Sequence, residues 1–236
     1  MSSAEELQDE PAMAATPTQL LDVAEHLFAK NGMDNVSIRE IVRASGQSNL
    51  SAAHYHFGSR EALIGALLTR RIRAINDIRH QRMDELVASG RDTSVHAIVL
   101  ASVGVLGDVV KTLPWGPDYV QVVSQALFSP KLQLLSLLDA RTVSGHTRCT
   151  LMLRRLLPQL PISVFKDRIW ILNNETAYNI ARWVQSNGPV TPSNSRRYAS
   201  LIRNTADFLA AGMAAAVGAP ATDGPAETDD NPKTSQ

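Results

Sequence analysis

The chain has 236 residues, enough for one large or two small domains, and its 44% hydrophobic and 19% charged composition is typical of a globular protein. Its formal net charge is zero, which argues mildly against a nucleic-acid-binding protein. A single cysteine, Cys149, excludes an intrachain disulfide and a cysteine-based metal cluster, and it favours a reducing cytoplasm.

The two ends of the chain have the composition of tails. Residues 1–15 are acidic and contain proline, residues 218–236 are of low complexity, and we expect both segments to be disordered. The acidic start lacks the basic and apolar regions of a signal peptide. No apolar run approaches the ~20 residues of a membrane span. We therefore expect a cytoplasmic protein that does not associate with a membrane.

Positive charge is concentrated in residues 60–82, where six arginines accompany only two acids, Glu61 and Asp77. This local charge of +4 weakens the objection raised by the neutral chain as a whole. Two interpretations stay open, because the arginines could form a solvated helix face or contact phosphate groups. We expect Arg60 to lie near phosphate, and the later arginines to serve solubility or contacts between domains.

The first helix is predicted to begin after Thr16, a possible cap, with Pro17 in its first turn. Its apolar residues recur at positions i, i+1, i+4, i+7 and i+8, which places them on one stripe. The pair Asn31-Gly32 should end the helix. The stripe consists of Leu20, Leu21, Ala24, Leu27 and Phe28. We expect it to cover the two short helices that follow.

Residues 36–57 predict two short helices joined by a tight turn. Ser37 is a suitable N-cap, and Glu40 three residues later completes a capping box. Gly46 accepts the left-handed conformation that ends helices, so the first helix should stop there. Small side chains at 51–53 keep the second helix thin enough to pack on its neighbour and enter a major groove about 12 Å wide. This order of elements is typical of a helix-turn-helix.

These residues resemble the N-terminal domain of the TetR family of transcriptional regulators. The matching residues are Leu20-Leu21, Ala24, Leu27-Phe28, Gly32, Ser37-Ile38-Arg39-Glu40-Ile41, Ala44-Ser45-Gly46 and Tyr55-His56-Phe57-Gly58-Ser59-Arg60-Glu61-Ala62-Leu63. The chain departs from the family pattern by one additional residue between Gly46 and Tyr55, and by His54 where the family often has Tyr. The resemblance implies an all-α protein of about nine helices, in which a three-helix DNA-binding head precedes a helical ligand-binding and dimerisation body.

The resemblance and side-chain chemistry together indicate which residues contact DNA. Asn and Gln amides can read adenine in the major groove, and Ser can donate or accept. Residues at the starts of helices can hold phosphate groups. By resemblance, Tyr55 and His56 would reach phosphates, whereas Asn49 could instead cap a helix and Tyr55 could belong partly to the core. The predicted DNA-binding set is Ser37, Arg39, Gln47, Ser48, Asn49, Ser51, Ala52, Tyr55, His56 and Arg60.

The boundary between head and body is predicted near residue 62, with a DNA-binding domain at 16–62 and a ligand-binding and dimerisation domain at 63–217. Apolar periodicity and breaks at Gly and Pro predict the helices of the body. They are expected at residues 60–88, 94–113, 118–128, 130–157, 163–186 and 193–217. By resemblance, the last two would pack against their counterparts in a second subunit as a four-helix bundle. The alternative is that they are central core helices.

A pocket is expected between the helices at 94–113 and 118–128 and the long helices after Pro130 and Pro161. Its walls would be mostly aliphatic, which suits a hydrophobic or amphipathic effector. The residues proposed to line it, each of which could instead belong to the core, are Trp115, Tyr119, Gln125, Trp170 and Asn173. Gly104 and Gly107 indicate close helix packing or room for a ligand, and we favour packing.

No residue pattern predicts catalysis, a metal or a cofactor. The sequence lacks an HExxH motif, paired carboxylates and a recognisable nucleophile turn. His54 and His56, two apart on a helix, point to different sides and would not form a metal pair. The resemblance to the TetR family implies instead a homodimeric, ligand-responsive repressor of a palindromic double-stranded DNA operator. The open alternatives are an activator of the same fold, an all-α enzyme, and an interaction adaptor without a DNA role.

Overall fold

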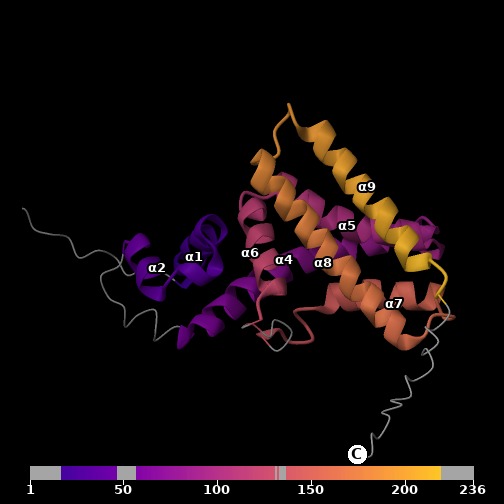
Figure 1. Ribbon diagram of the computed structural model, residues 1–236, viewed down its shortest axis with the longest axis horizontal. Coiled ribbons are helices and arrows are strands. Elements are labelled where there is room, and N and C mark those ends of the chain that lie inside the picture. Colours follow the sequence, from indigo (N-terminus) through magenta and orange to yellow (C-terminus); the bar gives the residue numbers. More distant parts are fainter. Residues whose placement is uncertain (1–16, 47–56, 131, 133–136, 219–236) are drawn as a thin grey trace, which may run out of the picture.

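The computed structural model of the protein describes residues 17–46, 57–130, 132 and 137–218 (Figure 1). Within these ranges the chain forms eight α-helices and two 3-10 turns, and it contains no strand. The helices, numbered as in Figure 1, are α1 (Pro17–Asn31), α2 (Ile38–Ala44), α4 (Arg60–Ala88), α5 (Val95–Thr112), α6 (Gly116–Phe128), α7 (Ser144–Leu156), α8 (Ile162–Asn187) and α9 (Ser195–Ala214); the 3-10 turns are Met33–Asn35 and Arg91–Thr93. The predicted all-α class is confirmed.

Serine side chains begin several of these helices. Ser37 Oγ accepts a hydrogen bond from the Glu40 N–H at 3.2 Å, and Glu40 Oε2 accepts one from the Ser37 N–H at 2.7 Å. This is the predicted capping box at the start of α2. Ser59 and Ser94 accept hydrogen bonds from backbone N–H groups in the first turns of α4 and α5. Short-range sequence chemistry therefore sets these three starting points.

Helix α4 passes through two hydrophobic cores and so connects the head to the body. In the first core, Leu63 and Leu67 of α4 are buried together with Phe28 of α1. In the second, Met83 of α4 is buried with Leu153 of α7. Figure 1 shows α1 and α2 near one end of α4 and helices α5 to α9 around the rest of its length. Any displacement of α4 therefore affects both parts.

Helix α5 lies inside the body, where it packs against α9 and also contacts α4, α6, α7 and α8. Its 18 residues have a mean hydropathy of 1.6, so by length and composition alone the helix could cross a membrane. The prediction that no apolar run approaches a membrane span overlooked this helix. In the folded protein 56% of it is buried among the other helices. Its apolar character thus matches that of a core helix.

The helix predicted at 130–157 is wrong at residues 137–143, because α7 begins only at Ser144, while residues 131 and 133–136 of that range lie outside the described residues. Before it, Asp139 Oδ1 accepts a hydrogen bond from the Thr142 N–H at 2.6 Å and stabilises a turn. Asn76 of α4 donates to the Thr142 carbonyl at 2.7 Å and accepts from the Gly145 N–H at 3.2 Å. A Cβ atom at Gly145 would lie 2.6 Å from Asn76 Oδ1. Contacts from a distant helix therefore determine the backbone just before α7.

Candidate functional site

The DNA-binding set falls into two groups, of which the structure describes one. Ser37 and Arg39 are exposed at the start of α2. Arg60 is half-buried, donates to the carbonyl oxygens of Met33 and Val36, and lies over the Phe28 ring at 5.5 Å. Its guanidinium is thus tied to the head's own backbone. The remaining seven, Gln47, Ser48, Asn49, Ser51, Ala52, Tyr55 and His56, lie outside the described residues.

Helix α6 holds the head against the body through polar contacts. Gln125 Oε1 accepts a hydrogen bond from the Met33 N–H at 2.6 Å, and Gln125 Nε2 donates to the Phe28 carbonyl at 3.3 Å. At the other end of α6, His26 Nδ1 lies 2.9 Å from Asp118 Oδ2. Gln125, which we expected to line the effector pocket, therefore connects the head to the body and is not among the residues that line the central cavity of the body.

A buried ion pair joins α1 to α4 beside this contact. Arg71 Nε donates to both carboxylate oxygens of Glu25 at 3.0 and 2.8 Å, and Arg71 Nη2 donates to Asp22 at 2.7 Å. Burial raises the pKa of Glu25, while the hydrogen bonds and charge of Arg71 act in the opposite direction. Arg71 also lies over the Trp115 ring at 4.5 Å. Trp115 is therefore part of the junction between head and body.

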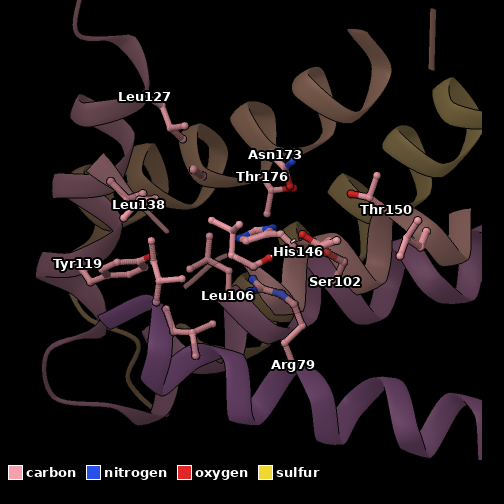
Figure 2. Close-up of a pocket in the computed structure, with 17 residues that line it drawn as sticks. Arg79, Ser102, Leu106, Tyr119, Leu127, Leu138, His146, Thr150, Asn173 and Thr176 are labelled. Atoms are coloured by element: carbon pink, nitrogen blue, oxygen red, sulfur yellow. Dashed lines mark hydrogen bonds between the residues drawn. The ribbon is translucent and has the colours of Figure 1, made fainter. Parts of the chain in front are cut away.

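The body encloses a cavity of about 360 Å³ between α4, α5, α6, α7 and α8 (Figure 2). Among the predicted effector residues, Tyr119 and Asn173 line it, whereas Trp115, Gln125 and Trp170 do not. Trp170 is instead 61% exposed on α8. The lining consists of Ile72, Ile75, Arg79, Ser102, Leu106, Tyr119, Val123, Leu127, Leu138, Val143, His146, Thr147, Thr150, Leu151, Asn173, Thr176 and Ala177. The volume and the mainly apolar walls are those of a small-molecule site.

Two polar residues at the centre of the cavity were not proposed as effector contacts. Burial and the neighbouring charge of Arg79 lower the pKa of His146 to about 3, while a hydrogen bond with Asn173 acts in the opposite direction. His146 is therefore neutral at physiological pH. Arg79 follows Ile72 and Ile75 on one stripe of α4, so an arginine on an apolar stripe was the sequence signal for it. His146 had no comparable signal, because its position depends on where α7 begins.

An apolar surface lies on the outer sides of α8 and α9. Trp170, Ile171 and Tyr178 of α8 are exposed, and Phe208 of α9 is 75% exposed. Single exposed apolar side chains are ordinary, but large aromatic ones on two adjacent helices are typical of a surface that a partner covers.

Comparison with known proteins agrees with this architecture. Residues 20–67 match the family described as "Bacterial regulatory proteins, tetR family". A relative, the HTH-type transcriptional repressor KstR2 of Rhodococcus jostii (strain RHA1), is 26% identical over 198 residues, which cover 78% of this chain and 88% of KstR2.

Solved structures share the fold. The fatty acid degradation regulator FadR of Bacillus halodurans has a TM-score of 0.60 at 14% identity, over 84% of this chain and 99% of that one. FadR of Bacillus subtilis, in complex with stearoyl-CoA, has a TM-score of 0.55 at 12% identity, over the same shares of both chains. The matched head and the repressor relative support a DNA-binding transcriptional regulator that resembles the TetR family, and the solved structures share its fold.

Proposed function

We propose that the chain is a cytoplasmic, homodimeric repressor that leaves a palindromic operator when a small hydrophobic or amphipathic molecule occupies the cavity. The observation that supports this is the path of α4, which begins beside the head and lines the cavity through Ile72, Ile75 and Arg79. A ligand that binds two conformations unequally shifts their populations, typically by about 1–3 kcal/mol of coupling. A helix that belongs to both parts can transmit that shift to the head.

Relatives support the direction of regulation and the type of effector. KstR2 is a repressor by name, so we prefer repression to activation. The Bacillus subtilis FadR structure contains stearoyl-CoA, an amphipathic molecule, and the cavity walls here are likewise mostly apolar. A reporter gene placed behind the operator distinguishes the two directions. Deleting a repressor raises its expression, whereas deleting an activator lowers it.

For DNA contact we propose that Asn49 reads base edges in the major groove, that Tyr55 contacts a phosphate, and that the rest of the predicted set contacts bases or phosphates of the same duplex. The test is a gel shift with a duplex that the wild-type protein selects from a random-sequence library. Asn49→Ala should weaken binding roughly tenfold or more, because a bidentate base contact contributes about 1–3 kcal/mol of discrimination. Tyr55→Phe should weaken it through a lost phosphate contact. Gln81→Ala, which removes an exposed amide from α4, is the matched control. Wild-type binding by both head variants would contradict the assignment.

For assembly we propose that α8 and α9 pair with the same helices of a second copy. The support is the exposed apolar surface that includes Trp170 and Phe208. Sedimentation equilibrium should show a dimer for the wild type and a monomer for Phe208→Glu, because a buried unpaired carboxylate is strongly unfavourable. Val87→Glu, at an exposed apolar residue near the end of α4, is the control and should stay dimeric. A monomeric wild-type protein would rule out this arrangement.

A further inference from the structure

Arg79 is a buried cation for which the described residues provide no counter-charge. Its side chain extends from α4 into the cavity toward His146 (Figure 2), and the residue is only 4% exposed. Its Nε and Nη1 groups have no hydrogen-bond acceptor in the described part of the protein. Burial lowers the pKa of Arg79, but a guanidinium stays protonated in proteins. The cavity therefore holds a positive charge of which two donor groups, Nε and Nη1, are unused among the described residues.

The described neighbours of Arg79 in the cavity do not neutralise its positive charge. Arg79 is the one charged side chain among the described lining residues, which include neither Asp nor Glu. His146 is neutral, and burial raises the pKa of Tyr119, so neither supplies a negative charge at physiological pH. Tyr119 and His146 can only accept or donate ordinary hydrogen bonds.

The first turn of α7 adds to the positive potential. Val143, the N-cap residue, lines the cavity together with His146 and Thr147 of that turn. The N-cap residue supplies no capping side chain, and of the N–H groups in this turn the one of Gly145 donates to Asn76 of α4. The N-terminus of a helix carries a partial positive charge and favours anions. Two independent features, the unpaired guanidinium and the helix end, thus favour negative charge in the same space.

An unpaired buried charge is strongly unfavourable, and an apolar residue at this position would continue the stripe of Ile72 and Ile75 without that cost. The other arginine that is buried among the described residues, Arg71, is paired with Glu25 and Asp22. Arg79 is thus the arginine whose burial the protein's own described residues do not offset. Such an uncompensated group in a ligand-sized cavity indicates that the ligand supplies the missing partner.

We propose that the effector is an amphipathic carboxylic acid, whose carboxylate pairs with Arg79 and whose apolar body occupies the space between α5, α6 and α8. This inference rests on the proposed function in taking the cavity as the effector site. A carboxylate accepts two parallel N–H groups from a guanidinium, so the pairing neutralises the charge and uses the orphaned donors. The aliphatic walls at Leu106, Val123 and Ala177 suit an alkyl or ring system.

The test uses matched acids and amides, measured by isothermal titration calorimetry on the full chain. The pairs are decanoate with decanamide, and 2-naphthoate with 2-naphthamide. At least one acid should bind roughly tenfold or more tightly than its amide, because charge-assisted hydrogen bonds exceed neutral ones by that margin. In Arg79→Met the preference should vanish. Arg82→Met removes the next arginine of α4, which pairs with Asp108 at 2.8 Å outside the cavity, and should keep the preference.

The unfolding midpoint in urea without ligand separates binding from a structural role. Arg79→Met should be at least as stable as the wild type, because it removes an uncompensated buried charge. S-methyl decanethioate distinguishes the free acid from a thioester, since this uncharged thioester lacks the carboxylate and its affinity should not depend on Arg79. If Arg79→Met does not fold, the proposal is tested by whether the wild-type protein binds the acids more tightly than the amides.

Three results would overturn the proposal: amides that bind as tightly as the acids, an acid preference that survives in Arg79→Met, or no binding by either acid at millimolar concentration. A parallel gel shift keeps the two proposals apart. Acids that bind through Arg79 without releasing DNA would refute effector-controlled repression and leave the anion site standing. Amides that release DNA to the same extent as the acids would refute the carboxylate site and leave effector-controlled repression standing.

Discussion

Three arginines on one helix, Arg71, Arg79 and Arg82, lie in three different electrostatic environments. Arg71 is buried and paired with Glu25. Arg79 is buried in the cavity, where its Nε and Nη1 find no acceptor among the described residues. Arg82 is partly exposed and bonded to Asp108. The residue type alone therefore does not determine the role of each arginine. The environment that the neighbouring helices provide decides whether an arginine stabilises the fold or is available to a ligand.

The buried pair in the head gives the first prediction. Glu25→Ala should lower the free energy of unfolding by about 3 kcal/mol, because it leaves Arg71 buried with only Asp22 to neutralise it. The double variant Glu25→Leu with Arg71→Met should recover most of that loss, since it removes both charges together. Urea unfolding followed by circular dichroism measures both. A double variant that is less stable than Glu25→Ala would contradict the electrostatic account.

The cavity histidine gives a prediction on pH. An unfolded chain binds a proton at His146 near pH 6.5, whereas the folded protein does so only near pH 3. Acidification below pH 6.5 therefore favours the unfolded state, by up to about 2 kcal/mol between pH 7.5 and pH 5. His146→Gln should reduce this loss, and His96→Gln, at an exposed histidine of α5, should not. Equal pH dependence of all three proteins in urea unfolding would show that His146 titrates normally.

At the scale of elements, α5 contacts its neighbours through glycines. A Cβ atom at Gly107 would lie 2.8 Å from Ile202 of α9, whereas one at Gly104 would lie 3.6 Å from the end of Arg82. Gly107 therefore marks the close approach of α5 and α9, as the packing interpretation of these glycines predicted. Gly104 is not so constrained, and neither glycine lines the cavity.

This difference predicts opposite effects of the same substitution. Gly104→Ala should stabilise the protein by up to about 1 kcal/mol, because alanine is the better helix former and has room. Gly107→Ala must displace Ile202, and it should destabilise the protein by about 1–3 kcal/mol. The melting temperatures of the two variants, measured side by side, give the comparison. A Gly107→Ala variant with a raised melting temperature would mean that Ile202 of α9 can move aside at little cost.

Elements set by adjacent residues could be predicted, and those set by distant ones could not. The capping box of Ser37 and Glu40 is local chemistry, and it lies where the sequence placed it. The start of α7 depends on Asn76, far away in sequence, and was missed. Tyr119 could be assigned to the pocket from the sequence. The apolar neighbours of Arg79, and the lack of an acceptor for its Nε and Nη1 among the described residues, became visible only with the helices assembled.

At the scale of the whole molecule, the contact between α6 and the head determines whether an effector can act on DNA. Gln125 bonds to the backbone of both Phe28 and Met33. One turn earlier, Gln121 bonds to the Ala181 carbonyl of α8, inside the body. Two glutamines of α6 therefore make different connections: Gln125 bonds to the head, and Gln121 bonds within the body.

This pair gives the last prediction. Gln125→Ala should reduce the effector-induced loss of DNA affinity, because the head no longer follows α6, and the coupling of about 1–3 kcal/mol should fall by half or more. Gln121→Ala should leave the coupling unchanged. Gel shifts with and without saturating decanoate measure it. If both variants respond like the wild type, the signal reaches the head through α4 alone.

The peptide groups of Met33 are held from two directions. Its carbonyl oxygen accepts a hydrogen bond from Arg60 at the start of α4, and its N–H donates to Gln125 of α6. When α4 and α6 move apart, one of these bonds has to break or the backbone has to rotate. The neighbouring Gly32, with a φ of 87°, is the residue best able to rotate. The head's orientation should therefore change in one step about this turn, as a swivel and not as a gradual bend.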